Sequence, residues 1–216
     1  MIFTDFKKRL LTALALLFLL FIIFVNDIAL LYTILVFGTL SIIEFFNLNQ
    51  KITKNKFIRL IFNSFFITFV FLFCATFFLF SNFIQLKIIS FIILIGCIAS
   101  DLGGYIIGKI FKGPKLTKIS PNKTISGAFG SIIFSIIIIN ILIFYNFEII
   151  NIKITFISVI SSIGCQSGDL FFSYLKRKAK LKDTGNFLPG HGGALDRLDG
   201  IFFGLPIGLL SFKLIY

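Results

Sequence analysis

The sequence predicts an all-α, polytopic integral membrane protein with about seven transmembrane helices, as judged from apolar runs near the length that crosses a bilayer. The hydrophobic content is 57% and the mean hydropathy is +1.02. A soluble domain of 216 residues could not hide that much apolar surface. The runs must form helices, because an isolated strand in lipid would leave backbone N–H and C=O groups without partners.

The apolar runs are separated by polar segments of very different length. Only Asn26 and Asp27 divide the first two runs, which predicts a tight helical hairpin. Basic residues precede the first run, as in a signal peptide, but no small-residue cleavage site follows it, so we expect it to remain as a helix. The runs are Leu10–Val25, Ile28–Phe46, Leu60–Phe80, Leu86–Phe111, Ser126–Tyr145, Ile154–Phe172 and Leu198–Ile215.

The net charge is +12, from 21 Lys and Arg against nine Asp and Glu. Basic residues between spans mark the cytoplasmic side of a membrane. If the N-terminus is cytoplasmic, all basic residues except Lys87, Lys153 and Lys213 fall on that side. This predicts a multi-pass protein of the cell (inner) membrane. Because topology explains the charge, we expect no nucleic-acid partner; basic loops also attract anionic lipid headgroups and phosphorylated ligands.

Two long polar segments, Lys112–Thr124 and Ser173–Arg197, fall on the same predicted cytoplasmic side. A loop that only joins two helices needs a few residues. These segments are longer and rich in Gly, Pro and Lys, so we expect them to carry the function.

The first candidate group surrounds Asp101, an ionisable residue in an apolar helix, where it usually faces a polar cavity or a partner. The alternative is a structural ion pair with a neighbouring helix. Gly103, Gly104 and Gly108 either allow close helix packing or unwind the helix beside a ligand. A helix N-terminus after a polar segment is a ready anion site, although an ordinary loop and N-cap is equally open. The candidate anion ligands are Ser120, Asn122, Lys123 and Thr124.

The second candidate group is denser and extends from Gly168 to Asp199. Asp169, Ser173 and Lys176 have the spacing of one helix face, as do Asp196 and Asp199. Carboxylates of this kind suit a hard cation that bridges phosphate oxygens, as Mg²⁺ prefers. A cation together with Lys and Arg makes such a site attractive to a nucleoside triphosphate. The alternative is a set of salt bridges along a polar loop.

Several single residues leave alternatives open. His191 is the only His, and it is a ligand contact, a general acid or base, or a loop residue; zinc is disfavoured because no Cys cluster accompanies it. Cys74, Cys97 and Cys165 lie in apolar runs and are read as small buried residues. Glu44 either lines the same cavity or, as the favoured interpretation, snorkels to the membrane interface.

One extended motif resembles a known family. The pattern Ser173-x-Leu-Lys-Arg-x₄-Lys-Asp-x-Gly-x₂-Leu-Pro-x-His-Gly-Gly-x-x-Asp-Arg-x-Asp199 resembles the signature of phosphatidate cytidylyltransferases (CDP-diglyceride synthetases). The segments Asp101–Tyr105 and Ser120–Thr124 look like another block of that family. The resemblance implies a single membrane domain over 1–216, with N-terminal spans in 1–100, a catalytic motif region in 101–200 and the last span in 198–215.

The resemblance also implies a reaction, in which a phosphatidate oxygen attacks the α-phosphorus of CTP to give CDP-diacylglycerol and pyrophosphate for phospholipid biosynthesis. It implies Mg²⁺, with a second, monovalent cation such as K⁺ as a further expectation, and a homodimer in the lipid bilayer. The implied metal ligands are Asp169, Asp196, Asp199 and Asp101. The other implied catalytic residues are Lys176, Arg177, Lys182, His191 and Arg197. The implied substrate-binding residues are Ser120, Asn122, Lys123, Thr124, Ser173, Asp183, Gly192 and Gly193.

The sequence departs from the family pattern at Ser126, where Glu is usual, and at Phe172, where an acidic residue is usual. Four alternatives remain: a CTP-dependent lipid or polyprenol kinase, a cytidylyltransferase that acts on another lipid phosphate, a non-catalytic relative, and a transporter with Asp101 and Asp169 along an ion path. A CDP-alcohol phosphotransferase is disfavoured because its Asp-Gly-x₂-Ala-Arg pattern is absent.

Overall fold

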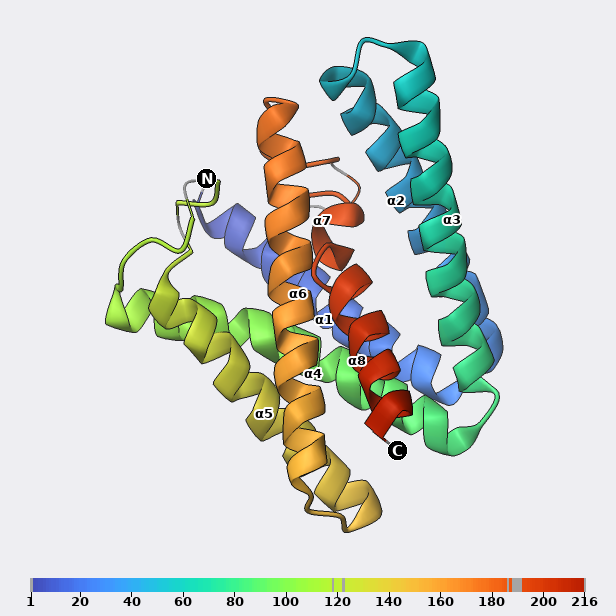
Figure 1. The fold of residues 1–216 in the computed structure, drawn as a ribbon, viewed down its shortest axis with the longest axis vertical. Coiled ribbons are helices and arrows are strands. Elements are labelled where there is room, and N and C mark those ends of the chain that lie inside the picture. The colour runs from blue at the N-terminus through green and yellow to red at the C-terminus, as the bar shows by residue number, and fades with distance from the viewer. Residues whose placement is uncertain (1, 118, 122, 186, 188–191, 216) are drawn as a thin grey trace. The chain divides into compact units, whose positions relative to one another are not determined.

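The computed structural model describes residues 2–117, 119–121, 123–185, 187 and 192–215. Within these ranges the chain folds into eight helices and forms no strand (Figure 1), which confirms the predicted all-α class. The helices are α1 Ile2–Val25, α2 Asp27–Ile52, α3 Lys56–Ser81, α4 Ile84–Phe111, α5 Ile125–Phe147, α6 Ile152–Lys178, α7 Leu195–Leu198 and α8 Ile201–Ile215.

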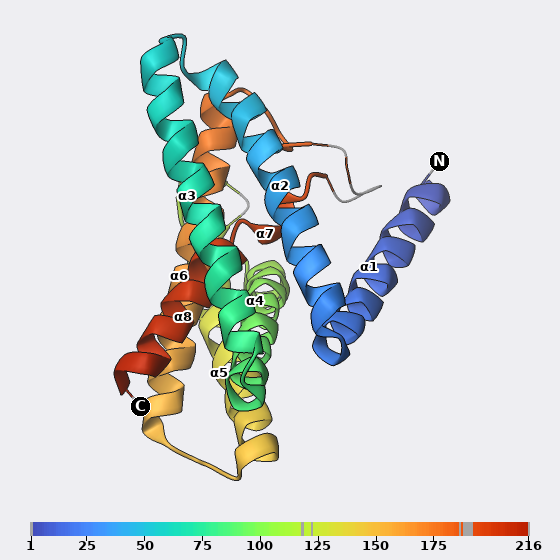
Figure 2. The same ribbon diagram turned by 90° about the vertical axis from the view of Figure 1, so that its right-hand side faces the viewer.

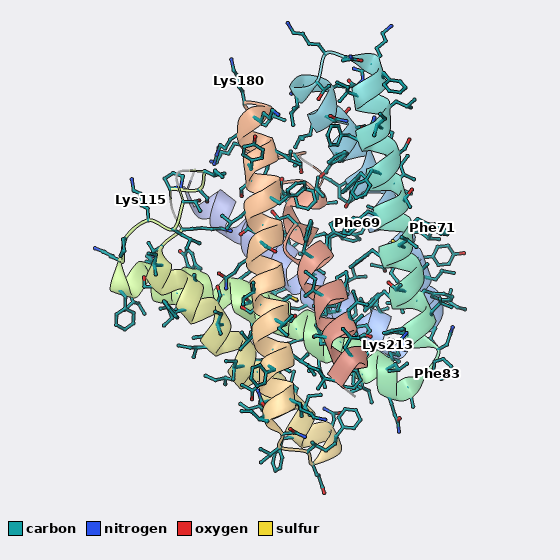
Figure 3. The ribbon with its side chains drawn as sticks, in the orientation of Figure 1. Phe69, Phe71, Phe83, Lys115, Lys180 and Lys213 are labelled. Carbon is teal, nitrogen blue, oxygen red and sulfur yellow. The ribbon has the colours of Figure 1, made fainter. Side chains whose placement is uncertain are left out.

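The helices correspond to the apolar runs of the sequence. In the described part of the chain, six segments are long and apolar enough to cross a membrane, the last being Leu195–Ile215, which joins α7 and α8. In α1 the apolar segment Leu11–Val25 is shorter. Large apolar side chains such as Phe71 on α3, which is 68% exposed, point outward (Figure 3). A polytopic membrane protein is therefore confirmed, because lipid is the solvent that covers such a surface.

The chain forms two compact units. Unit 1 comprises Met1–Ser81 and Leu175–Leu198, and unit 2 comprises Asn82–Tyr174 and Asp199–Tyr216. Each unit has its own internal packing, while the single membrane domain expected from the sequence stays a prediction.

Unit 1 is built on the predicted helical hairpin. Asn26 ends α1 and caps α2, and its side-chain oxygen accepts hydrogen bonds from the N–H groups of Ile28 (2.9 Å) and Ala29 (3.2 Å). Such a cap satisfies backbone donors that the first helical turn leaves free. The next helices, α2 and α3, run side by side in opposite directions (Figures 1 and 2). The Phe45 and Phe66 rings stack between them, with centroids 3.9 Å apart.

Unit 2 depends on close contact between α4 and α5. A Cβ atom added at Gly103 would lie 2.6 Å from the carbonyl oxygen of Gly130, and one at Gly104 would lie 2.5 Å from the Ser131 hydroxyl oxygen. Because α4 stays helical to Phe111, these glycines serve close helix packing, and the alternative of an unwound helix is wrong. Small residues that let helix backbones approach are typical of membrane proteins.

Small polar groups and thiols complete the interior of unit 2. The hydroxyls of Ser100 on α4 and Ser162 on α6 share a hydrogen bond of 2.8 Å, and the Ser161 hydroxyl donates to the carbonyl oxygen of Gly204 at 3.1 Å. Cys97 and Cys165 are fully buried free thiols, as predicted, whereas Cys74 of unit 1 is only half-buried. These bonds join α4, α6 and α8 without the need for a large polar core.

Candidate active site

In unit 1, the carboxylate of Asp196 is enclosed by three hydrogen-bond donors. Its Oδ1 accepts from Lys176 Nζ at 2.8 Å, and the two side chains are 7% and 12% exposed, respectively. Its Oδ2 accepts from the backbone N–H groups of Thr184 (2.8 Å) and Gly193 (3.0 Å). The ion pair joins the end of α6 to the short helix α7, and the two backbone bonds close the intervening loop.

A second carboxylate in unit 1, that of Glu44 on α2, holds the same loop. Glu44 is only 7% exposed. Its Oε2 accepts from the Thr184 hydroxyl (2.8 Å) and the Leu195 N–H (2.9 Å), and its Oε1 accepts from the Ala194 N–H (3.0 Å). The favoured prediction that Glu44 snorkels to the interface is therefore wrong, because three donors hold the side chain inside the unit.

These two carboxylates explain three glycines of the loop. Cβ atoms added at Gly185 and Gly193 would collide with the Glu44 carboxylate. Gly192 has a φ of +84°, and a Cβ atom there would lie 2.9 Å from Asp196 Oδ2. A positive φ favours glycine. Gly192 and Gly193 are predicted to bind substrate, and that role stays a prediction; in the structure both have a role in loop packing.

In unit 2, Asp169 on α6 forms an ion pair with Lys123 from the segment before α5. Asp169 Oδ1 also accepts from the Ser173 hydroxyl at 3.2 Å, one helical turn away. The Asp169 and Lys123 side chains are 28% and 27% exposed, so this pair is more open than the Lys176–Asp196 pair. Three of the predicted site residues are thus brought together here.

The segment between α4 and α5 is held by its own hydrogen bonds. Thr124 caps α5, because its hydroxyl oxygen accepts from the Gly127 N–H at 3.1 Å. The Ser126 hydroxyl accepts from the Gly113 N–H at 3.2 Å, so Ser126 fastens the start of the segment. Ser120 lies in a turn in which its carbonyl oxygen accepts from the Lys123 N–H at 3.0 Å. The N-cap interpretation of Thr124 is confirmed.

The remaining two predicted metal ligands belong to unit 2. Asp199 is 8% exposed, and its Oδ1 accepts from the Gly200 N–H at 2.9 Å. A Cβ atom at Gly168, next to Asp169, would lie 2.5 Å from the Asp199 carbonyl oxygen, so this glycine lets α6 approach Asp199. Asp101 is exposed on α4, and its carboxylate accepts a weak bond from the Cys165 thiol, with 3.5 Å between sulfur and oxygen.

Other predicted site residues lie on the surface of unit 1, where Arg177, Lys182, Asp183 and Arg197 are exposed. Between Arg177 and Lys182 in the sequence, Lys178 and Lys180 are exposed as well. Lys180 projects beyond the end of α6 (Figure 3). Asn122 and His191 lie outside the described residues.

Comparison with known proteins identifies the family. A model of the cytidylyltransferase family matches residues 5–215. The chain belongs to the cytidylyltransferase family. This assignment confirms the resemblance seen in the motif from Ser173 to Asp199, and it extends over both units.

Curated relatives give a finer comparison. The chain is 44% identical over 110 residues to a phosphatidate cytidylyltransferase of Staphylococcus saprophyticus, covering 50% of this chain and 42% of the relative. It is 45% identical over 108 residues to one of Rickettsia felis, covering 46% and 48%, and 36% identical over 132 residues to one of Helicobacter pylori, covering 61% and 49%. The chain therefore spans about half the length of the curated relatives it matches.

The carboxylates of this cytidylyltransferase-family chain suit Mg²⁺ as hard oxygen donors. Asp169 and Asp196 each have a lysine partner and lie in units 2 and 1, respectively. In the described residues, no three His, Cys, Asp or Glu side chains are gathered closely enough to hold a metal ion. The donor chemistry fits a hard cation, and the assignment of metal ligands stays a prediction.

Glu44 is the residue whose environment sequence reasoning misjudged, because snorkelling was favoured over a place inside the protein. It lies 140 residues or more before its three hydrogen-bond partners, so no local spacing connects them. One signal was available, because an ionisable residue inside an apolar span is by default a candidate for function. That argument singled out Asp101 and applies equally to Glu44.

Proposed function

We propose that the chain is a phosphatidate cytidylyltransferase. A phosphate oxygen of phosphatidate attacks the α-phosphorus of CTP, the bond between the α-phosphorus and the bridging oxygen breaks, and pyrophosphate leaves as CDP-diacylglycerol forms. The observation that carries the proposal is the buried Lys176–Asp196 pair at the base of the loop that carries Lys180 and Lys182. Family membership and the names of the relatives support the same reaction.

The exposed basic residues near the end of α6 suit the triphosphate of CTP. Arg177, Lys178, Lys180 and Lys182 form a cationic stretch in unit 1. Clustered positive charge raises the local concentration of an anionic substrate and offsets its charge. Arg guanidinium groups bind phosphate oxygens in pairs, whereas Lys acts as a point charge.

Asp169 and Asp196 would hold Mg²⁺, which when bound would neutralise phosphate charge and polarise the phosphoryl oxygens. Phosphoryl chemistry of this kind requires little covalent help from the protein, since positioning and charge stabilisation dominate. Ion pairs with Lys123 and Lys176 orient the Asp169 and Asp196 carboxylates, respectively.

We place the protein in the cell inner membrane, with the N-terminus and both long polar segments cytoplasmic. The support is the distribution of basic residues, which favours that orientation. A homodimer and a second, monovalent cation such as K⁺ are further expectations from the family.

The test is product analysis with full-length protein in liposomes that contain phosphatidate. With CTP and Mg²⁺ we expect CDP-diacylglycerol by mass spectrometry and an equal amount of pyrophosphate. Asp196→Asn should abolish both, whereas Asp27→Asn, the same change at an exposed residue in the first turn of α2, should leave them unchanged. Folded wild-type protein that forms neither product would contradict the proposal.

A further inference from the structure

Glu44 shares its loop contacts with Asp196. Thr184 is held twice, through its hydroxyl by Glu44 and through its N–H by Asp196. Across the loop, the Gly193 N–H donates to Asp196, and the next two N–H groups along the chain donate to Glu44. We call these four donor residues the loop base: Thr184, Gly193, Ala194 and Leu195.

The chemistry of the contacts requires a carboxylate at position 44. All three partners of Glu44 are donors, and a carboxylate is an acceptor only. A Gln side chain would keep one oxygen but would point N–H bonds at one or more of these donors. The glycines at 185 and 193 pack directly against the Glu44 carboxylate, because a Cβ atom at either position would collide with it.

The N–H groups of Ala194 and Leu195 belong to the start of α7, where backbone donors have no partner within the helix. Glu44 supplies those acceptors from α2. Asp196 follows Leu195 directly, so the direction of its carboxylate depends on the first turn of α7. Glu44 itself contacts the loop base through both oxygens and is buried, so its carboxylate is occupied by the loop.

We propose that Glu44 is a positioning residue of the transfer reaction: it fixes the loop base and thereby the orientation of the Asp196 carboxylate. The inference rests on the proposed function, in which Asp196 is a metal ligand. Loss of Glu44 should therefore weaken the response to Mg²⁺ more than the capacity for turnover, because excess cation recovers a misdirected ligand by mass action.

The test is the Mg²⁺ concentration that gives half-maximal activity in full-length protein. Glu44→Gln should raise this concentration at least tenfold, with most of the turnover recovered at saturating Mg²⁺. The value for Glu44→Asp should fall between those of wild type and Glu44→Gln. The matched control is Asn49→Leu on the same helix, because Asn49 is buried and bonds α3 through Asn63 at 2.7 Å. It should lower thermal stability without changing the Mg²⁺ response. An unchanged response in Glu44→Gln, or an equal shift in Asn49→Leu, would overturn the proposal.

A milder variant covers the case in which Glu44→Gln does not fold. Thr184→Val removes one donor to Glu44 and should raise the half-saturating Mg²⁺ severalfold, whereas Thr184→Ser keeps the hydroxyl and should match wild type. If Thr184→Val also matches wild type, the hydroxyl bond to Glu44 does not position Asp196 and the proposal fails.

Amide hydrogen exchange separates this inference from the proposed function. If wild-type protein makes no CDP-diacylglycerol, the proposed reaction fails on its own account. Glu44→Gln should still speed exchange at Ala194 and Leu195 at least tenfold over wild type, while Glu148→Gln, the same change at an exposed residue, should not. Equal exchange rates in wild type and Glu44→Gln would show that Glu44 does not hold the loop base.

Discussion

Breaking the Lys176–Asp196 pair should destabilise the protein by a predictable amount. The charged atoms lie 2.8 Å apart, and the side chains are 12% and 7% exposed. Removing one partner of a buried pair costs about 3–5 kcal/mol, because the other charge stays buried without compensation. Since both side chains keep slight exposure, we expect Lys176→Met to lower the free energy of unfolding by about 3 kcal/mol, at the low end of this range.

Asp196→Asn should cost at least as much. The Asn amide has one acceptor oxygen, so it either turns its NH₂ toward the Lys176 ammonium or abandons the N–H groups of Thr184 and Gly193. Each hydrogen bond to a charged group contributes about 1.5–3 kcal/mol. The double variant should cost less than the sum of the singles, with a coupling of about 1–3 kcal/mol, as is usual for residues in direct contact.

The assay is unfolding of purified protein by SDS titration in mixed micelles, followed by circular dichroism. The matched controls are Lys182→Met and Asp183→Asn, the same two changes at exposed positions close in sequence. Each control should stay within about 0.5 kcal/mol of wild type, as surface substitutions usually do. The reasoning is refuted if Lys176→Met and Asp196→Asn lower the free energy of unfolding no more than the controls Lys182→Met and Asp183→Asn. It is also refuted if the effects of Lys176→Met and Asp196→Asn are additive in the double variant.

Three further outcomes follow from the account. Asp169→Asn should reduce turnover at least 100-fold with a smaller loss of stability than Asp196→Asn, because its side chain is 28% exposed; near wild-type turnover would remove it from the site. Excess EDTA should abolish activity and Mg²⁺ should restore it, so full activity in EDTA would contradict the metal role. In a variant without native cysteines, Lys115→Cys should react with an impermeant maleimide only after cells are opened, and Phe83→Cys should react in intact cells; the reverse pattern would overturn the topology.

The helices could be predicted because lipid imposes one strong condition on the sequence. Every backbone group inside the membrane must find a partner within its own segment, so apolar runs of sufficient length become helices. The hairpin at Asn26 could be predicted for the same reason. The polar break between the first two apolar runs is so short that the end of α1 and the N-cap of α2 must both fall within it. The glycine contacts of Gly103 and Gly104 remained open in the sequence, because close packing and unwinding need the same residue type.

The polar contacts were predicted less completely. Sequence spacing placed Asp169 and Ser173 on one helix face, and the structure shows their hydrogen bond. The bonds of Asp196 to Thr184 and Gly193 depend on loop geometry that no periodicity encodes. Ser126 appeared only as a departure from the family pattern, yet its hydroxyl holds the Gly113 N–H. Sequence spacing thus indicated a partner within one helix and missed the partners that come from a loop or from another helix.

The fate of the phosphates of CTP tests the central claim most directly. Full-length protein in phosphatidate liposomes should be given CTP labelled at either the α- or the γ-phosphorus, with Mg²⁺ present. The account predicts that the lipid product carries the α label and that the γ label leaves as pyrophosphate. A lipid product that carries the γ label would identify a kinase and contradict cytidylyl transfer.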